Sequence, residues 1–339
     1  MLKKQKHILV IRLSAMGDVA MCVPVLRAFC EQHPEIKLTV LTRAFFTPFF
    51  RDIPQVTVFA PDLKGKHKGV FGLFKLSKEL KTLKIDAVAD LHNVLRTNIL
   101  KLFFFGKRFV QIDKGRNEKK ALTEGRVFQQ LKTTHERYAD VFRALGYSLT
   151  LKNPSFPELA KLKLGTQELL ESNTKHWIGM APFAQYDSKM YPLDLLEKVI
   201  HKLSRTHKVI LFGGGKQEVK ILNQFQNKYE NVVNVAGQFD LNEELNIISN
   251  LDVMVSMDSG NAHLAAMLGK KVITIWNVTH PFAGFSAFNQ PEEHAVLANR
   301  TQFPLIPTSI YGNRYPEHYK EASRTIAPET IIKKIESVL

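Results

Sequence analysis

A chain of 339 residues is too long for one typical hydrophobic core and long enough for two domains. Its hydrophobic content of 45% and charged content of 23% exclude a disordered chain, and no apolar run approaches the roughly 20 residues that span a bilayer. The formal net charge of +15 favours an anionic partner: nucleic acid, anionic lipid or a phosphorylated substrate. The charge is spread over local clusters (residues 64–68, 114–120 and 152–163), and each cluster alone is typical of a solvated surface.

The N-terminal stretch MLKKQKHILVIRLSAMGDV is basic and then apolar, as a signal peptide would be. Arg12 and Asp18 interrupt the apolar run and no small-residue cleavage site follows, so we reject a signal peptide. Cys22 and Cys30 lie on one predicted helix, about 12 Å apart along its axis, which is too far for a disulfide. Two reduced, buried thiols in a cytoplasmic protein are therefore expected.

Short apolar runs alternate with amphipathic stretches through the first half of the chain, a pattern typical of βαβ units and parallel sheets. The expected strands cover residues 7–13, 37–41, 56–59, 87–90 and 109–112. The expected helices cover residues 19–32, 70–83, 96–104 and 136–145. Residues 149–170 carry two prolines and many lysines, and we interpret them as a connecting region.

The same alternation restarts after this region. Strands are expected at residues 177–181, 208–212, 232–234, 253–256, 272–275 and 295–297, and helices at 193–205, 218–228, 241–249 and 262–268. A last helix is expected from Pro328, because proline suits the first helical position. The restart predicts two doubly wound α/β domains, residues 1–172 and 173–339. Such sheets bind ligands outside the carboxyl ends of their strands, so the loops that follow the strands are the candidate sites.

The loop after the first strand reads RLSAMGDV. Gly17 permits a close backbone approach or unusual dihedral angles. Asp18 stands where a helix begins, so helix capping and a catalytic role are both open from the local sequence. Pro24 predicts a kink or a short first turn. The loop lacks both the G-x-G-x-x-G fingerprint and the P-loop pattern, which disfavours a nicotinamide cofactor or a Walker-type ATP site here.

Two loops of the second half hold further candidates. Lys189 is the one cation of the stretch PFAQYDSKMYPLD, and it either contacts a phosphate or lies on the solvated surface. Three glycines, residues 213–215, follow the next strand and either admit a ligand to the backbone or form a plain turn. Glu218 either accepts hydrogen bonds from ribose hydroxyls or caps a helix.

The stretch SMDSGNAHLAAMLGKKV reads as the end of a buried strand, a tight acidic turn and a helix of small residues. Helix N-termini attract anions, and Ser259, Gly260 and Ala262 leave first-turn N–H groups open to a ligand. His263 either packs in the core or donates to a phosphate. The stretch therefore predicts a diphosphate site, and the sequence shows no metal-binding motif. Asp258 stands where an anion would dock, so its role needs an explanation.

Two segments carry a family resemblance. ILVIRLSAMGDVAMCVPVLRAF resembles the N-terminal signature of glycosyltransferase family 9, the bacterial lipopolysaccharide heptosyltransferases. MVSMDSGNAHLAAMLGKKVITIWNVTHP resembles the donor signature near the C-terminus of that family. Weaker similarities are DLHNVLRTN, APFAQYDSKMYPLD and LFGGGKQE. In their order and spacing these segments cover nearly the whole chain.

The resemblance implies the GT-B architecture, two Rossmann-like doubly wound domains facing a central cleft. Residues 1–172 would bind the acceptor and residues 173–339 the nucleotide sugar, with the last helix (about 328–339) packing back on the N-terminal domain. The implied reaction transfers a heptose from ADP-heptose to the lipopolysaccharide inner core, a Kdo–lipid A type acceptor, with inversion and without a metal or other cofactor. The implied enzyme is a cytoplasmic monomer, peripheral at the inner face of the bacterial inner membrane, that binds no nucleic acid.

The resemblance also assigns site residues. Asp18 becomes the catalytic base that takes the proton of the acceptor hydroxyl. The implied diphosphate-binding residues are Lys189, Asp258, Ser259, Gly260, Asn261 and His263. The implied nucleoside-binding residues are Gly213, Gly214, Glu218 and Phe239, the last of them against the adenine. The implied acceptor-binding residues are Ser14, Gly17, His92, Asn93, Arg96, Lys114 and Arg116.

Three departures from the family pattern concern the sugar and the acceptor. Asn261 stands where the family often has proline or another residue, NVTH at residues 277–280 replaces the common GPT, and DLHN at residues 90–93 replaces DLQG or DLHG. These departures leave the reaction type unchanged and the particular sugar and acceptor open.

Four alternatives remain from the sequence. They are transfer of another nucleotide sugar to a different surface glycan, a sugar-nucleotide epimerase on the same scaffold, a nucleic-acid-binding protein and an inactive scaffold. No helix-turn-helix, zinc finger or interleaved aromatic–basic strand supports nucleic-acid binding. The presence of Asp18, Lys189 and Asp258 argues against an inactive scaffold. For Asp258 we consider two roles: accepting N–H groups at the helix start, or pairing with Lys189 and holding that cation toward the phosphate.

Overall fold

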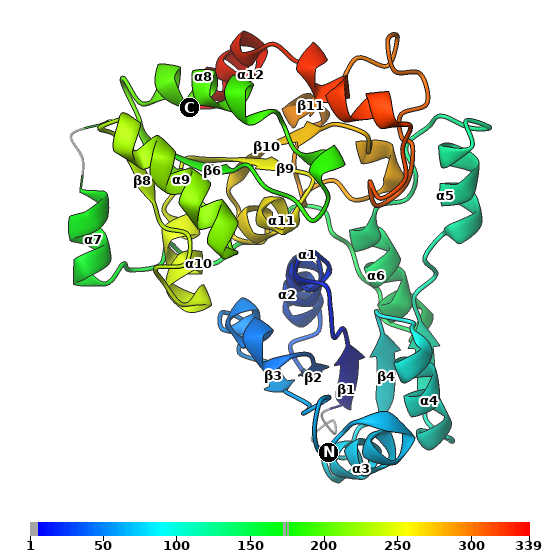
Figure 1. The fold of residues 1–339 in the computed structure, drawn as a ribbon. Helices are drawn as coiled ribbons and strands as arrows, with labels where there is room; N and C mark the ends of the chain where they lie inside the picture. The colour runs from blue at the N-terminus through cyan, green and yellow to red at the C-terminus, as the bar shows by residue number, and fades with distance from the viewer. Residues whose placement is uncertain (1–5, 172–173, 175) are drawn as a thin grey trace. The chain divides into compact units, whose positions relative to one another are not determined.

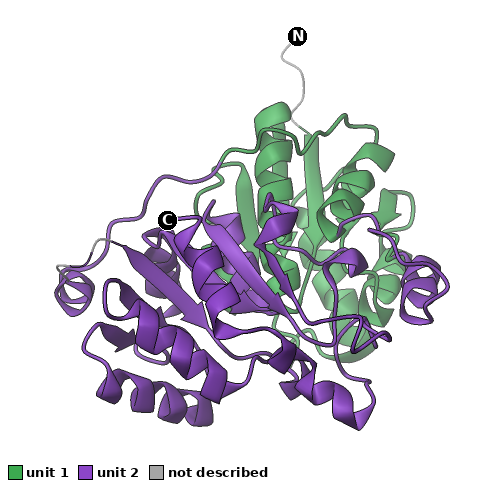
Figure 2. Cartoon of the chain, turned by 90° about the horizontal axis from the view of Figure 1, so that it is seen from above, with its two compact units in different colours: residues 1–114, 134–155 green, residues 115–133, 156–339 purple. Residues whose placement is uncertain are grey.

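The structure is a computed structural model, and it describes residues 6–171, 174 and 176–339. The chain forms two compact units: unit 1 comprises residues 1–114 and 134–155, and unit 2 comprises residues 115–133 and 156–339 (Figure 2). Each unit contains one parallel β-sheet with helices packed on it (Figure 1). The prediction of two doubly wound α/β domains is confirmed.

The sheet of unit 1 has five parallel strands in the order β3-β2-β1-β4-β5. They are β1 (Lys6–Ile11), β2 (Ile36–Leu41), β3 (Val56–Phe59), β4 (Ala87–Asp90) and β5 (Arg108–Gln111). The helices are α1 (Met16–Ala20), α2 (Cys22–Gln32), η1 (Ala44–Phe50, a 3-10 helix), α3 (Gly69–Thr82), α4 (Leu95–Phe103) and α6 (Thr134–Ala144). The central strand β1 is buried from Ile8 to Ile11, as expected for a parallel strand that is covered on both faces.

The helix predicted at residues 19–32 is interrupted, because α1 ends at Ala20 and α2 begins at Cys22. Pro24 is the third residue of α2. Proline has no N–H to donate to the carbonyl four residues earlier, and its ring clashes with that carbonyl, which here belongs to Ala20. The predicted kink or short first turn is therefore confirmed. Cys22 and Cys30 are buried and not bridged, and burial raises the pKa of each thiol to about 12.

The sheet of unit 2 has six parallel strands in the order β11-β10-β9-β6-β7-β8. They are β6 (Trp177–Ala181), β7 (Lys208–Leu211), β8 (Val232–Asn234), β9 (Val253–Met257), β10 (Lys271–Trp276) and β11 (Ala295–Leu297). The α-helices are α5 (Arg116–Thr123), α7 (Leu164–Leu170), α8 (Leu193–Leu203), α9 (Lys216–Lys228), α10 (Leu241–Ser249), α11 (Gly260–Met267) and α12 (Pro328–Glu336). The 3-10 helices are η2 (Asp187–Lys189), η3 (Pro281–Ala283), η4 (Glu292–His294) and η5 (Glu317–Thr325).

The core of unit 2 joins one face of the sheet to α8, α9 and α12. Val255 of β9 and Ile273 of β10 belong to this core. Helix α12 lies beside α8 (Figure 1) and contributes Ile331 and Ile335 to the same core. The isoleucine face of α12 is thus used within unit 2, and the expected packing of the last helix on the N-terminal domain stays a prediction.

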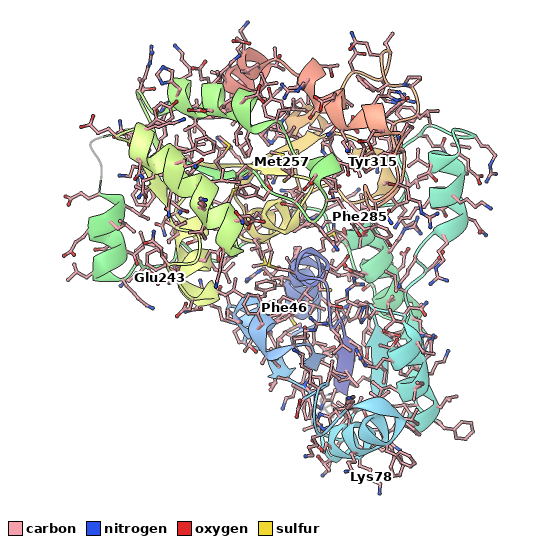
Figure 3. The ribbon with its side chains drawn as sticks, viewed as in Figure 1. Phe46, Lys78, Glu243, Met257, Phe285 and Tyr315 are labelled. Atoms are coloured by element: carbon pink, nitrogen blue, oxygen red, sulfur yellow. The ribbon has the colours of Figure 1, made fainter. Side chains whose placement is uncertain are left out.

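The connecting region predicted at residues 149–170 divides between the units at residue 155. Its second part is tied to α10 by buried hydrogen bonds. The Glu243 carboxylate, which is fully buried (labelled in Figure 3), accepts from the Thr166 hydroxyl at 2.6 Å and from the Lys163 N–H at 3.1 Å. The domain boundary predicted between residues 172 and 173 lies outside the described residues.

Residues 115–133 belong to unit 2, although the chain enters them from unit 1. The Leu131 N–H donates to the Phe282 carbonyl at 2.9 Å, and the Arg300 guanidinium stacks 3.4 Å from the centre of the Phe128 ring. Helix α5 in this segment was not predicted, because Leu122 is the one buried residue of this fully described helix and the sequence shows no apolar stripe.

Candidate functional site

In each unit, the loops that carry the predicted site residues follow strands on either side of a switch in strand order. In unit 1 the chain runs from β1 outward to β2 and β3, and then returns to β4 on the other side of β1. In unit 2 it runs from β6 outward to β7 and β8, and then returns to β9 on the other side of β6. Open α/β sheets bind ligands at such switch points, outside the carboxyl ends of the strands. The loops after β1 and β4, and those after β6 and β9, are therefore two candidate sites.

Asp18 lies in the first turn of α1, and its side chain is 28% exposed. One carboxylate oxygen, Oδ2, lies 2.5 Å from Nη2 of Arg12 and accepts the Ala15 N–H at 3.2 Å. Within the described part of the chain, the other oxygen, Oδ1, has no hydrogen-bond partner. The capping and catalytic roles of Asp18 are thus compatible, because Oδ2 caps the helix and Oδ1 stays open to a ligand.

Arg12 is the residue that fixes the Asp18 carboxylate. Its side chain is 9% exposed, and its Nη1 donates at 2.7 Å to the carbonyl of Leu91, which follows β4. The guanidinium carbon lies 5.9 Å from the centre of the Tyr138 ring. Burial by itself would lower the pKa of Arg12, but the neighbouring Tyr138 and Asp18 raise that pKa above its ordinary value. Arg12 is therefore a cation that holds Asp18 from a fixed position.

His92 follows β4 and is buried next to Arg12. Its Nδ1 accepts a long hydrogen bond of 3.5 Å from the Leu13 N–H, so we assign the proton of the neutral ring to Nε2. Burial, and then the positive charges of Arg12 and Lys114, lower the pKa of His92 to about 3. The imidazole is neutral at physiological pH, and it offers a hydrogen-bond donor rather than a positive charge.

The buried carboxylate of Asp90 shapes the loop that carries this histidine. It accepts the N–H groups of His92 and Asn93, each at 3.0 Å, and the Gln111 side-chain amide at 2.9 Å. Asn93 has a positive φ of 45°, and its side-chain amide donates to the Ile112 carbonyl at 3.0 Å. The segment DLHN therefore forms a tight turn that orients His92.

The other residues predicted to bind the acceptor divide between the units. Ser14 is partly buried in the loop after β1, Gly17 is partly buried in α1, and Arg96 is exposed in the first turn of α4. Lys114 belongs to unit 1, and its positive charge helps to lower the pKa of His92. Arg116 begins α5 and belongs to unit 2. Six of the seven predicted acceptor residues are thus in unit 1, and their role stays a prediction.

Lys189 and Asp258 meet at the switch point of unit 2. Lys189 ends η2, which follows β6, and Asp258 follows Met257, the last residue of β9 (labelled in Figure 3). The Lys189 Nζ lies 2.7 Å from Oδ2 of Asp258, and the two side chains are 13% and 10% exposed. The Thr279 hydroxyl donates to the same oxygen at 2.9 Å. Of the two roles considered for Asp258, the structure contains the ion pair with Lys189.

The N-terminus of α11 is accessible next to this ion pair. Ser259 is the N-cap residue and Gly260 the first helical residue, and both are partly exposed, as is Asn261. The Ser259 hydroxyl bonds to the Ser256 hydroxyl at 3.1 Å and does not cap the helix. His263 is buried within the first turn. Because the neighbouring carboxylate is already paired with a lysine, the field at this helix end favours an anion.

Three of the four residues predicted to bind the nucleoside, Gly213, Gly214 and Glu218, lie at or just before the start of α9. Glu218 accepts the Gly214 N–H through Oε2 at 2.7 Å, so it ties the glycine loop to the first turn of α9. A Cβ atom at Gly213 would lie 3.0 Å from Leu222 and 3.1 Å from Glu218, so a larger residue would have to displace one of those side chains. Phe239, in the loop after β8, is partly buried. Contacts of Glu218 with ribose and of Phe239 with adenine stay predictions.

Two residues of these sites were missed by sequence reasoning, Arg12 and Thr279. Arg12 carried a signal, because a charged side chain within the apolar run ILVIRL needs a fixed partner when it is buried. No signal in the sequence pointed to Thr279, because its contact with Asp258 joins two different loops, those after β9 and β10. Among the described residues, no group of three or more His, Cys, Asp or Glu side chains could hold a metal ion.

Unit 2 also contains a cavity of about 480 Å³ that none of the predicted site residues lines. Its wall is mainly apolar and includes Phe128, Trp276, His280 and Arg300. Burial, and then the charge of Arg300, lower the pKa of His280 to about 4. His280 accepts the Phe282 N–H through Nδ1 at 3.2 Å, which places a neutral ring against the cavity.

Comparisons with known proteins agree on one family. A model described as glycosyltransferase family 9 (heptosyltransferase) matches residues 73–303. The chain is 26% identical to the lipopolysaccharide core heptosyltransferase OpsX of Haemophilus influenzae, over 81% of this chain and 80% of that protein. It is also similar to two solved structures. The match to a glycosyltransferase family 9 protein from Veillonella parvula has a TM-score of 0.76 at 19% identity, and it covers 100% of this chain and 98% of the V. parvula chain. E. coli heptosyltransferase WaaC with ADP-2-deoxy-2-fluoro heptose has a TM-score of 0.68 at 18% identity, with coverage of 98% and 99%.

Proposed function

The chain belongs to glycosyltransferase family 9, the heptosyltransferases, with the two-domain GT-B fold of that family, and from this premise we propose that it transfers a heptose from ADP-heptose to the lipopolysaccharide inner core. The acceptor in this proposal is of the Kdo–lipid A type. The transfer inverts the anomeric centre and uses no metal ion. Unit 2 binds the nucleotide sugar, and unit 1 binds the acceptor.

One observation carries this proposal: the mostly buried Lys189 is fixed by Asp258 at the switch point where α11 begins. A diphosphate bound there would accept hydrogen bonds from the Lys189 ammonium and from the first-turn N–H groups of α11. When the bond between the sugar and the diphosphate breaks, negative charge develops on the leaving ADP. These donors stabilise that charge, so the chain's own groups do the work that a metal ion does in other transferases.

Asp18 is the proposed general base. As the acceptor hydroxyl oxygen attacks the anomeric carbon, its proton passes to Oδ1 of Asp18, the oxygen that Arg12 leaves unbound. The new bond forms on the face opposite the departing diphosphate, and this inverts the anomeric configuration. Neutral His92 donates from Nε2 to an oxygen of the acceptor, while Arg12 keeps the Asp18 carboxylate in place.

The donor assignment draws support from similar proteins. E. coli WaaC was solved with ADP-2-deoxy-2-fluoro heptose, and the H. influenzae relative is a lipopolysaccharide core heptosyltransferase by name. In the proposed donor complex, Glu218 contacts the ribose and Phe239 packs against the adenine. Gly213 and Gly214 let the nucleoside approach the backbone before α9.

The proposed acceptor and the proposed location in the cell rest on the net charge of the protein. A net charge of +15 suits a phosphorylated, lipid-linked acceptor at the anionic inner face of the inner membrane. No helix within the described residues is long and apolar enough to cross a membrane. We propose a cytoplasmic monomer that associates peripherally with the membrane, where its positive charge meets the anionic lipid. The proposed acceptor-binding residues are Ser14, Gly17, His92, Asn93, Arg96, Lys114 and Arg116.

The decisive experiment is a transfer assay with ADP-heptose and a Kdo-containing acceptor, read by mass spectrometry. The wild type should add one heptose and release ADP. Asp18→Asn should lower kcat by about 10²–10⁴-fold, because it removes the base, and should leave the ADP dissociation constant unchanged. Asp52→Asn is the matched control, because Asp52 is an exposed carboxylate of unit 1. Undiminished turnover in Asp18→Asn would rule out the base assignment.

A thermal-shift screen of nucleotides tests the donor. At about 100 times their dissociation constant, ADP compounds should raise Tm by about 5–10 °C, and UDP or GDP compounds should not. Selective stabilisation by another nucleotide would indicate a different sugar and glycan. Epimerisation of the donor without an acceptor would indicate an epimerase, and tight duplex binding without ADP binding would indicate a nucleic-acid-binding protein.

A further inference from the structure

One surface of unit 1 displays large apolar side chains to solvent. Val70, Phe71 and Phe74 are exposed on α3, and Leu102 and Phe105 are exposed at the end of α4. Phe71 is 86% exposed and Phe105 is 97% exposed, so nearly the whole of each ring lies in water. Single exposed apolar residues are ordinary, but a contiguous set marks an interaction surface. We call these five residues the apolar patch.

The apolar patch is not the side of the helices that packs in the core. Helix α3 buries Leu73, Leu76 and Leu80, and the α4 segment buries Leu100 and Phe104, all in one core cluster. The patch residues lie on the outward faces, where a surface helix normally carries polar side chains. Both helices thus have their core contacts, and the apolar patch is left for an external partner.

The two parts of the apolar patch adjoin each other. The Phe74 ring of α3 and the Phe103 ring of α4 lie 5.5 Å apart between centroids, and the two helices pack together. Phe71 lies one turn before Phe74, and Phe105 lies two residues after Phe103. The apolar patch therefore covers one continuous surface over the contact between α3 and α4.

Basic residues surround the apolar patch. Residues 62–108 contain eleven Lys and Arg against four Asp and Glu. The Nζ of Lys78 (labelled in Figure 3) lies 4.5 Å from the centre of the Phe74 ring. One of the four acids, Glu79, is paired with Lys66 at 2.7 Å and adds little free negative charge. The surface around the exposed rings is therefore positively charged.

We propose that the apolar patch and its lysines dock on an anionic lipid bilayer. Exposed rings next to lysines match a surface that is negative at its headgroups and apolar beneath them. The rings enter the boundary between headgroups and acyl chains, and the lysine stems extend so that their ammonium groups stay at the phosphates. Nucleic acid would match the charge, but it offers no apolar phase for Leu102 and Phe105. The inference rests on the proposed function in that the lipid-linked acceptor lies in the same membrane.

Vesicle sedimentation with the full-length protein tests the proposal. Vesicles of phosphatidylcholine alone are compared with vesicles that also contain phosphatidylglycerol, at low and at high salt. At low salt the protein should bind the phosphatidylglycerol vesicles at least ~10-fold more tightly, and high salt should reduce this preference because it screens the lysines. Equal binding to both lipids, or binding to neither, would overturn the proposal.

Two double variants separate the apolar and the charged contributions. Phe71→Ser with Phe105→Ser should weaken vesicle binding by about 10-fold per ring, at both salt concentrations. Lys75→Gln with Lys78→Gln should weaken it by about fivefold per lysine at low salt and much less at high salt. All four side chains are exposed, so Tm should stay at the wild-type value.

Matched controls use exposed side chains of unit 2. Leu164→Ser with Leu305→Ser controls for the loss of apolar surface, and Lys161→Gln with Lys202→Gln controls for the loss of charge. Both control proteins should bind phosphatidylglycerol vesicles like the wild type. If they lose binding as strongly as the patch variants do, the assignment to α3 and α4 is wrong.

Transfer assays separate this inference from the proposed function. With a delipidated acceptor in solution, Phe71→Ser with Phe105→Ser should turn over at the wild-type rate, and with an acceptor in vesicles it should be about 10-fold slower or more. A wild type that binds phosphatidylglycerol vesicles but transfers no heptose contradicts the proposed function alone. If the apolar patch instead joins two copies of the chain, sedimentation velocity will show wild-type dimers without lipid and monomers of the variant, which would overturn the membrane proposal.

Discussion

Lys189 and Asp258 form an ion pair in which both side chains are mostly buried, and the Thr279 hydroxyl donates to the same Asp258 oxygen as the lysine. This arrangement explains why a carboxylate stands where an anion is expected to bind. Asp258 does not need to touch the diphosphate, because its charge is balanced by Lys189. Its carboxylate instead sets the position of the cation that contacts the phosphate in the proposed complex.

The ion pair predicts the behaviour of Asp258→Ala. This change leaves a mostly buried lysine without its partner, so the free energy of unfolding should fall by about 3 kcal/mol. The Lys189 ammonium is also released from its position, so the ADP dissociation constant should rise by about 10-fold, which corresponds to ~1.4 kcal/mol. Urea unfolding and isothermal titration calorimetry measure the two effects.

The double variant Lys189→Met with Asp258→Ala is the control for this pair. It removes both charges, so it should recover part of the stability lost in Asp258→Ala while binding ADP no better. Thr279→Val should cost less stability than Asp258→Ala, because it removes one hydrogen bond and no charge. If Asp258→Ala is as stable as the wild type and binds ADP equally well, the positioning role is wrong.

Arg12 is predicted to act on catalysis through Asp18. Arg12→Met removes the partner of Oδ2, and a carboxylate misplaced by about 1 Å costs roughly 100-fold in kcat. The KM for ADP-heptose should not change, because the donor site of the proposal lies in unit 2. Arg12→Lys keeps the charge without the fork geometry, so it should restore part of kcat. Steady-state kinetics with both substrates tests this, and a normal kcat in Arg12→Met would contradict it.

The strands could be predicted because parallel strands that are covered on both faces read as short apolar runs. The expected strands at residues 177–181 and 232–234 agree residue for residue with β6 and β8. Helices need an apolar stripe to be recognised, and α5 has one buried residue, Leu122. The assignment of residues 115–133 to unit 2 could not be predicted either, because no change in composition marks where the chain passes from one unit to the other.

The loops that form the candidate sites could be predicted from the sequence, but the contacts between their side chains could not. Asp18, Lys189 and Asp258 follow strands, and the rule for doubly wound sheets places such residues at a ligand. The contact between Lys189 and Asp258 depends on β6 lying next to β9, and a strand order that skips β7 and β8 cannot be read from local sequence. The contact of Arg12 with the Leu91 carbonyl could not be predicted for the same reason, because it depends on β4 lying next to β1.

The docking of residues 156–171 on α10 makes a prediction about local opening. Thr166→Val removes the 2.6 Å hydrogen bond to the buried Glu243 carboxylate, at a cost of about 1–2 kcal/mol. This segment should then open more often, so trypsin should cut at Lys161 or Lys163 about 10-fold faster. Thr82→Val is the control, because the Thr82 hydroxyl bonds within its own helix. Unchanged cleavage in Thr166→Val would mean that other contacts hold the segment.

Two of the buried histidines, His92 and His280, should make the protein less stable in mild acid. Burial lowers the pKa of His92 to about 3 and that of His280 to about 4, whereas a histidine in the unfolded chain has a pKa of about 6.5. Between these values the unfolded state binds a proton that the folded state does not bind. The free energy of unfolding therefore has its full value above pH ~6.5 and falls as the pH drops toward the folded pKa. At pH ~5 the loss is ~2 kcal/mol per histidine.

Replacing either histidine should flatten this dependence. His92→Gln and His280→Gln each remove one titrating group, so the free energy of unfolding should lose ~2 kcal/mol less between pH ~7 and pH ~5 than that of the wild type. The double variant should show the sum, because the two residues lie in different units. Urea unfolding at each pH measures the slopes. A slope in His92→Gln as steep as in the wild type would show that the folded protein accepts a proton on His92 near pH ~6.5, in conflict with its burial beside Arg12.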